Sequence, residues 1–158
     1  MDERAKTQVL EWFPYGLYAI GVREGERSNA FTANWVTQVA FEPPMVAVSV
    51  ENDGASVGMM RASKVFSVNV FEATQRTPAA RLARPYARVP GKLEEYRYRA
   101  GETGAPLLED ALGYVECRIV AEVPAGDHTV FVGEVVGAGV FREGEPLTIR
   151  AAGFKYAG

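Results

Sequence analysis

Apolar and polar residues alternate over much of the chain, and this period of two predicts a protein built mainly of β-strands. β-Branched and aromatic residues, which favour strands, are concentrated in the same stretches. The predicted strands are residues 15–22, 30–41, 45–50, 65–71, 112–123 and 128–141. Segment 30–41 differs from the others because its polar side chains fall on both faces.

Short helices are predicted at residues 3–12, 55–63 and 77–84. Pro14 and Pro85 end the first and the third, and a polar residue of the turn 52–54 is expected to cap the second. The remaining segments are polar loops at 24–29 and 88–106, a tight turn at 124–127 and a short glycine-containing tail after residue 146. Strands dominate and follow one another closely, so we expect one domain over residues 1–158, a small antiparallel barrel with two or three short helices.

Composition excludes several classes of protein. The net charge of −3 argues against nucleic-acid binding, which needs a basic face toward phosphates. Cys117 is the single cysteine and His128 the single histidine, which excludes an intramolecular disulfide and a cysteine-rich or histidine-rich metal site. We expect Cys117 to be a small apolar side chain within a strand. No apolar run approaches the ~20 residues of a membrane span and no leader pattern occurs, so a cytoplasmic protein without membrane contact is expected.

Two catalytic motifs are absent or only apparent. No Gly-x-Gly-x-x-Gly follows a strand and opens a helix, so no Rossmann dinucleotide domain is expected. Gly54, Ser56 and Gly58 match the Gly-x-Ser-x-Gly nucleophile elbow, and a triad would run through His128 and an acid such as Asp110. The chain lacks the strand–helix alternation that such hydrolases require, so a bound cofactor is the better source of chemistry.

The strand-like segment 32–38 is unusually rich in amide and hydroxyl groups. Its residues are Thr32, Ala33, Asn34, Trp35, Val36, Thr37 and Gln38, and Ser49, Asn52 and Ser56 follow within the next elements. A flavin needs such hydrogen-bonding groups for its pyrimidine edge, and a helix beginning near residue 55 offers its N-terminus to a phosphate. An edge strand with a polar outer face explains the segment equally well from the residues alone.

Several motifs occur in an order that resembles a known family. They are residues 15–18, 32–38, 43–50, 66–70, 104–107 with 116–117, and 126–135. Together they cover nearly the whole chain, which is similar to the flavin-reductase-like FMN-binding split-barrel family and within it to the short ferric-reductase and flavoredoxin-like branch. The resemblance implies a split barrel of Greek-key type with non-covalently bound FMN near a homodimer interface.

The resemblance also assigns roles to residues. Residues 32–38 would line the isoalloxazine ring, and Ser56 would lie near the phosphate. The ring or ribityl chain would be flanked by Ser49, Val50, Glu51 and Asn52. His128 would lie at the barrel rim where a nicotinamide stacks, and a structural role in its turn is the alternative. Residues 153–156 depart from the longer members, which leaves a contribution of the tail to the substrate pocket open.

Other residues have open alternatives. Trp35 would pack in the barrel, in the dimer interface or on the flavin. A local basic cluster is a solvated face or an anion contact; its members are Arg81, Arg84, Arg88 and Lys92.

The function implied is an NAD(P)H-dependent flavin or ferric reductase that passes hydride from NADH or NADPH to the flavin N5. The acceptor would be a second flavin, ferric iron, a partner monooxygenase or an electron-transfer protein. The alternatives are an FMN electron carrier reduced by a separate partner, a flavin storage or sensing module, and a barrel that has lost its flavin.

Overall fold

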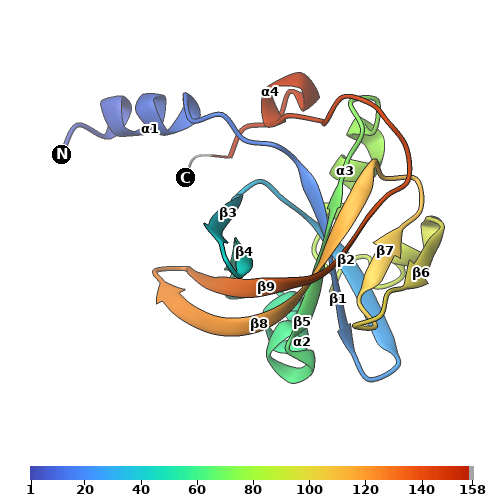
Figure 1. Cartoon of the computed structure of the whole chain (residues 1–158). Helices are drawn as coiled ribbons and strands as arrows, with labels where there is room; N and C mark the ends of the chain where they lie inside the picture. Colours follow the sequence, from blue (N-terminus) through green and yellow to red (C-terminus); the bar gives the residue numbers. More distant parts are fainter. Residues whose placement is uncertain (157–158) are drawn as a thin grey trace.

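The computed structural model describes residues 1–156 and shows a seven-stranded antiparallel sheet rolled into a barrel (Figure 1). The strand order is β2-β1-β5-β8-β9-β4-β3. These strands are β1 (Tyr18–Glu24), β2 (Arg27–Ala33), β3 (Val36–Phe41), β4 (Pro44–Glu51), β5 (Val65–Val70), β8 (Gly113–Ala125) and β9 (His128–Val140). A separate hairpin pairs β6 (Tyr98–Ala100) with β7 (Pro106–Leu108). The expected mainly-β antiparallel barrel is confirmed.

The two edge strands of the sheet, β2 and β3, are consecutive in sequence. Only Asn34 and Trp35 separate them, and β2 also contacts β4. The sheet therefore closes on itself at a point where β2 and β3 diverge, which leaves the barrel split. We call the two residues at this point, Asn34 and Trp35, the seam.

Short helices accompany the barrel and differ in how closely they pack against it. The helices are α1 (Glu3–Glu11), α2 (Ala55–Ser63), α3 (Arg76–Leu82) and α4 (Ile149–Ala152), with a 3₁₀ helix η1 (Lys92–Glu95). Helix α2 packs against β1, whereas α1 stands away from the barrel and has no buried residue (Figure 1). None of the helices within residues 1–156 has the length and apolar character needed to cross a membrane.

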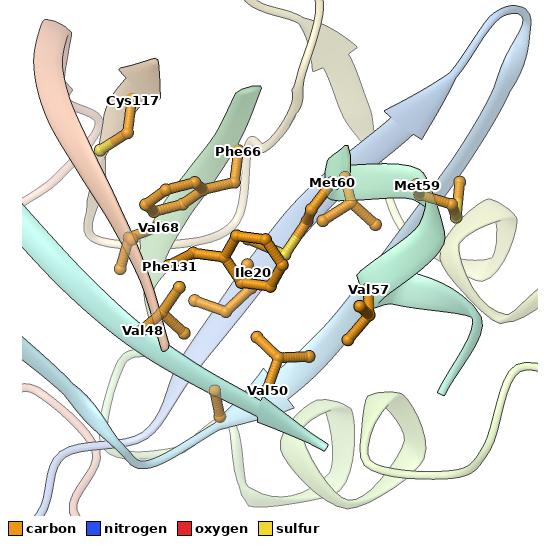
Figure 2. Close-up of a cluster of buried hydrophobic side chains, with 12 residues drawn as sticks. Ile20, Val48, Val50, Val57, Met59, Met60, Phe66, Val68, Cys117 and Phe131 are labelled. Carbon is orange, nitrogen blue, oxygen red and sulfur yellow. The ribbon is translucent and has the colours of Figure 1, made fainter. Parts of the chain in front are cut away.

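The main core fills the barrel interior. Ile20, Val48, Phe66 and Phe131 are fully buried there, and α2 adds apolar side chains that include Met60 (Figure 2). Burial of each such side chain stabilises the fold by ~1.5–3 kcal/mol. A second cluster lies among the strands, α3, η1 and α4; its largest members are Leu17, Phe71, Leu82, Leu93, Leu108 and Leu147. The two cores hold α2 and α3 in fixed positions beside the seam.

Several predicted boundaries were wrong. Segment 30–41 is two strands, because the chain turns at the seam. The loop 24–29 is a two-residue turn in which Gly25 has φ +57°, and the rest of that segment is already strand. Segment 88–106 is not a plain loop but contains η1 and β6.

The helix predictions were accurate in position but not in capping. Helix α2 matches the predicted 55–63 at both ends, but its N-cap is Gly54, which supplies no side-chain oxygen. Helix α4 was not predicted; the Thr148 hydroxyl caps it by accepting from the N–H of Ala151 at 3.1 Å.

Candidate functional site

A cavity of about 700 Å³ opens at the seam of the barrel. Its walls are the ends of β2 and β4, the first turn of α2, the segment after α3, the first residue of β9 and the C-terminal residues 154–156. Nine of the predicted site residues line it: Thr32, Ala33, Asn34, Trp35, Ser49, Val50, Glu51, Ser56 and His128. The structure thus brings residues from four separate segments to one place.

Four predicted residues do not line this cavity. Val36, Thr37 and Gln38 belong to β3, and the last two are exposed. The side chain of Asn52 is occupied elsewhere: its Nδ2 donates to the carbonyl of Gly126 at 3.3 Å, and its Oδ1 accepts from the Thr129 hydroxyl at 2.7 Å. Asn52 therefore ties the turn before α2 to the start of β9.

Two buried asparagines that line the cavity each have one unpaired polar atom. Asn29 is 1 % exposed and Asn34 is 8 % exposed. Asn29 Nδ2 donates to the Ser56 hydroxyl at 3.4 Å, but Asn29 Oδ1 and Asn34 Nδ2 have no partner. A buried polar atom without a partner costs about 1–3 kcal/mol. A ligand with a donor for Asn29 and an acceptor for Asn34 would remove that cost.

The first turn of α2 provides free N–H groups at the cavity wall. Because Gly54 caps the helix without a side chain, its first N–H groups are left for another acceptor. Helix N-termini carry partial positive charge and bind anions. Arg84, from the segment after α3, lines the same cavity.

The predicted basic cluster divides into groups with different surroundings. Arg81 Nε lies 2.9 Å from a carboxylate oxygen of Glu95, and Arg88 does not line the cavity. Lys92 is 2 % exposed and donates to the carbonyl oxygens of Leu82 and Arg84, each at 2.6 Å. Burial lowers the pKa of Lys92 to about 8. Arg84 is thus the member best placed to meet an anionic ligand.

His128 is fixed by its neighbour in the turn before β9. Its Nδ1 lies 2.6 Å from Asp127 Oδ1, and this hydrogen bond lowers the pKa of Asp127. Its Nε2 lies 3.4 Å from the hydroxyl of Tyr156. The ring of Trp35 is 4.8 Å from the His128 ring and 5.1 Å from the Tyr156 ring, between centroids. Three aromatic rings therefore meet at the cavity wall.

The nucleophile elbow is not assembled as a triad. The hydrogen bonds of His128 are to Asp127 and Tyr156. Asp110 pairs with Arg97 at 2.6 Å, and the Ser56 hydroxyl accepts from Asn29. The hydrolase alternative is therefore not supported. No group of three His, Cys, Asp or Glu side chains in residues 1–156 is placed to hold a metal ion.

Sequence reasoning missed two parts of the cavity wall. Asn29 fell in a predicted loop, and the tail residues Phe154, Lys155 and Tyr156 were left without a role. The sequence offers one signal for Asn29. It lies an even number of positions before Phe31 on the same strand, so the two side chains point to the same face of that strand. For the tail, only the three-dimensional return of the chain over the cavity reveals the contact.

Comparison with known proteins shows the family of this chain. The chain matches the family described as flavin reductase like domain over residues 10–158. It is 36 % identical to an NADH-dependent FAD reductase of Streptomyces globisporus, over 87 % of this chain and 76 % of that protein. It is 33 % identical to a ferric-chelate reductase (NAD(P)H) of Archaeoglobus fulgidus, over 85 % of this chain and 80 % of that protein.

Some relatives are considerably longer than this chain. It is 32 % identical to the high molecular weight rubredoxin of Moorella thermoacetica over 90 % of its length, but spans 63 % of that protein. It spans 22 % of a putative diflavin flavoprotein of Nostoc at 35 % identity.

Solved structures share the fold. Component B of a nitrilotriacetate monooxygenase from Mycobacterium thermoresistibile superposes with a TM-score of 0.84 at 26 % identity, over 93 % of this chain and 82 % of that one. An NADH:FAD oxidoreductase of Streptomyces globisporus in complex with NAD and FAD fragments gives 0.82 at 31 % identity, over 92 % and 87 %. An FMN-binding protein from Thermus thermophilus gives 0.78 at 27 % identity, over 84 % and 74 %.

Proposed function

The chain belongs to the flavin reductase like domain family, and we propose that it is an NAD(P)H-dependent flavin reductase with its flavin in the cavity at the seam. The observation that carries the proposal is that two residues lining the cavity have buried polar atoms without a partner, Asn29 Oδ1 and Asn34 Nδ2.

The cavity residues fit the chemistry of a flavin. A flavin combines a planar ring system, a pyrimidine edge with carbonyl oxygens, a chain of hydroxyl groups and a phosphate. Asn34 Nδ2 supplies a donor suited to a ring carbonyl, and Asn29 Oδ1 an acceptor suited to a hydroxyl. Ala33 and Val50 supply apolar surface. When bound, the flavin supplies two-electron acceptor chemistry that no side chain provides.

We propose FMN as the resident flavin. The uncapped N-terminus of α2 and the guanidinium of Arg84 on one cavity suit a terminal phosphate monoester. Relatives and neighbours are named for FAD as well as FMN, so the comparison of FMN with FAD and riboflavin is part of the test.

The assigned role of His128 is to orient the nicotinamide of the electron donor. Its ring lies on the cavity wall and is held by Asp127, which fixes the direction of Nε2. Hydride transfer depends on contact distance and orientation more than on proton transfer by a side chain. We therefore assign His128 to positioning. Asp127 keeps the His128 ring in place, and Trp35 packs against it.

We further propose a homodimer that works in the cytoplasm. Apolar side chains are exposed on three strands of the sheet: Val39 and Phe41 on β3, Val120 and Val123 on β8 and Val136 on β9. Phe41, on an edge strand, is 89 % exposed. A second copy of the chain would cover side chains of this kind. Light scattering of the purified protein tests the dimer, and Phe41→Glu should shift it toward monomer.

Reconstitution followed by anaerobic reduction tests the function. Purified protein is titrated with FMN, FAD and riboflavin by calorimetry, and the loaded protein is mixed with NADH and with NADPH in a stopped-flow instrument. The expected result is saturable binding and loss of flavin absorbance near 450 nm with at least one donor. Failure to bind any flavin would overturn the site. Binding of flavin without bleaching by either donor would favour the alternative function, an FMN electron carrier that is reduced by a separate partner.

An asparagine substitution locates the flavin. Asn34→Ala removes an amide whose Nδ2 has no partner within the protein, so folding should tolerate it. Flavin affinity should fall by about 1 kcal/mol, roughly fivefold, for one lost hydrogen bond. Gln38→Ala is the matched control, because Gln38 is exposed and outside the cavity. Equal affinity for both variants and the parent would place the flavin elsewhere.

A further inference from the structure

The C-terminal tail, residues 153–156, forms a wall between two cavities. Ile149, Phe154, Lys155 and Tyr156 line both the cavity at the seam and a second cavity of about 630 Å³. The second cavity is completed by the segment after α1, including Phe13 and Tyr15. Figure 1 shows the described end of the chain returning toward α1 from α4. The tail thus has open space on both sides.

One end of the tail is firmly anchored. Gly153 has φ +70°, a left-handed conformation that glycine adopts without strain, and there the chain reverses after α4. The N–H of Phe154 donates to the carbonyl of Ile149 at 3.1 Å, and the guanidinium of Arg76 lies 5.7 Å from the centre of the Phe154 ring. Phe154 also packs against the second core cluster.

The other end is held weakly. Tyr156 is 44 % exposed, and its hydroxyl lies 3.4 Å from His128 Nε2, at the outer limit of a hydrogen bond. Its ring makes an edge contact with Trp35. Lys155 is 81 % exposed at its side chain and pairs with Glu11 at 3.6 Å, an arrangement that contributes little. Tyr156 can therefore leave Trp35 and His128 while Phe154 stays in place.

Tyr156 covers the groups that a flat aromatic donor would meet. Its ring lies against Trp35 and its hydroxyl against His128, which is 7 % exposed beneath it. Burial is the largest cause that raises the pKa of Tyr156, and the negative charges of Glu51, Asp127 and Asp53 raise it further. The phenol is therefore neutral and able to donate a hydrogen bond. A nicotinamide ring with its carboxamide has the same combination of a planar ring and a polar edge.

We propose that the tail is a gate whose Tyr156 ring occupies the place beside Trp35 and His128 that the nicotinamide ring of the electron donor takes, and that the donor displaces it toward the second cavity. The inference rests on the proposed function, because it names a residue that controls donor access to the same site. The anchored Phe154 is the fixed point of this movement, which involves Lys155 and Tyr156. Between donor encounters the closed gate shields the site from water.

The first test needs no flavin. Trp12 is 63 % exposed and would obscure the signal, so the measurement uses a Trp12→Phe background in which Trp35 is the single remaining tryptophan. Tyr156→Ala should increase acrylamide quenching of Trp35 fluorescence about twofold, because the ring that covers it is gone. Tyr156→Phe should leave quenching near the parent value. Unchanged quenching in Tyr156→Ala would show that the tail does not cover Trp35 and would overturn the gate.

The second test measures donor binding to flavin-loaded protein. Calorimetric titration with NAD⁺ and NADP⁺ avoids turnover. Tyr156→Ala should bind the nucleotide that the parent prefers 3- to 10-fold more tightly than the parent does, since no ring has to be displaced. Its affinity for flavin should change less than twofold. Tyr98→Ala, on the separate hairpin, is the matched control and should bind as the parent does.

The outcomes separate the gate from the proposed function. Equal or weaker nucleotide binding by Tyr156→Ala in protein that still binds flavin and bleaches with a donor would overturn the gate and leave the reductase standing. Absence of flavin binding in the parent would overturn the reductase. In that case the quenching measurement alone decides whether the tail closes over Trp35, and the gate's assignment to a nicotinamide falls with the reductase.

Discussion

The ammonium nitrogen of Lys92 lies 2.6 Å from the carbonyl oxygen of Arg84 and donates a hydrogen bond to it. A second hydrogen bond of the same length reaches the carbonyl of Leu82. Lys92 therefore satisfies carbonyl groups at the C-terminal end of α3 from a position outside that helix. Through this contact it fixes the segment that presents Arg84 and Tyr86 to the cavity.

Replacement of Lys92 by methionine should destabilise the protein. Methionine keeps most of the apolar stem but leaves the two carbonyl groups without their donor, at a cost of about 2–4 kcal/mol. Urea unfolding at pH 7 measures the loss. Arg88→Met, at an exposed position of the same segment, should change the free energy of unfolding by less than about 0.5 kcal/mol. An equal effect of the two variants would contradict the structural role of Lys92.

The same residue should make stability depend on pH in the alkaline range. The folded-state pKa of Lys92 is about 8, against 10.5 in the unfolded chain, so between these values the unfolded state binds more protons. The Lys92 contribution to the free energy of unfolding should therefore rise with pH from about 8 to 10.5 and stay constant below. We expect the difference between the parent and Lys92→Met to grow by about 2 kcal/mol from pH 7 to pH 10. A constant difference, measured by urea unfolding at both pH values, would refute this.

Two glycines should respond to alanine in opposite directions. A Cβ at Gly133 would lie 2.6 Å from Phe66 Cε1 and 2.7 Å from Cys117 Cβ, inside the barrel core. Gly133→Ala should therefore lower the free energy of unfolding by about 1–3 kcal/mol. A Cβ at Gly58, exposed within α2, meets nothing within 4 Å. Gly58→Ala should raise stability by about 1 kcal/mol, and thermal unfolding of both variants provides the check.

Cys117 should be chemically inert in the folded protein. It is fully buried. Burial is the main cause that raises the pKa of its thiol to about 12, and the negative charge of Glu116 adds to it. Since the thiolate is the reactive form, labelling by a disulfide reagent at pH 8 should be on the order of a thousandfold slower than in 6 M guanidinium chloride. Comparable rates with and without denaturant would show that Cys117 is accessible.

Arg84 should distinguish phosphorylated from unphosphorylated flavin. We expect the parent to bind FMN more tightly than riboflavin, and Arg84→Ala to lose about 1–2 kcal/mol of FMN affinity with riboflavin affinity unchanged, because a charged hydrogen bond to the phosphate is removed. Arg88→Ala is the matched control outside the cavity. If both flavins lose affinity equally in Arg84→Ala, Arg84 contacts the ring or shapes the wall instead.

Strong local patterns made most of the fold predictable. The hairpin of β8 and β9 follows from two long alternating runs around a tight turn, and α2 from a change of periodicity bounded by turn residues. The seam was not predictable, because Asn34 and Trp35 are neither glycine nor proline and lie between strand-forming residues. It is created by the closure of the sheet, which is a long-range property. Helix α4 is only four residues long, although Thr148 and Gly153 are recognisable signals at its ends.

The lining of the candidate site was predictable where polar residues interrupt strand-forming residues, as at Asn34. It was less predictable where burial determines what a residue contacts. Lys92 carried the same sequence signal as Arg88, yet one is buried and the other exposed. Asn29 looked like part of a loop because the hairpin turn is shorter than its polar surroundings suggest. Burial depends on which distant segments cover a residue, and the local sequence does not specify that.

The seam also constrains how this fold is able to diversify. Successive side chains of a strand point to opposite faces, so one residue inserted between Ala33 and Val36 would turn β3 over relative to β2 or force both edges apart. The turn at Gly25 and Glu26 carries no such constraint, because nothing lies within 4 Å of a Cβ placed on Gly25. Changes of loop length should therefore accumulate at the hairpin tips. The seam beside the cavity should instead keep its length of two residues and vary only in the identity of their side chains.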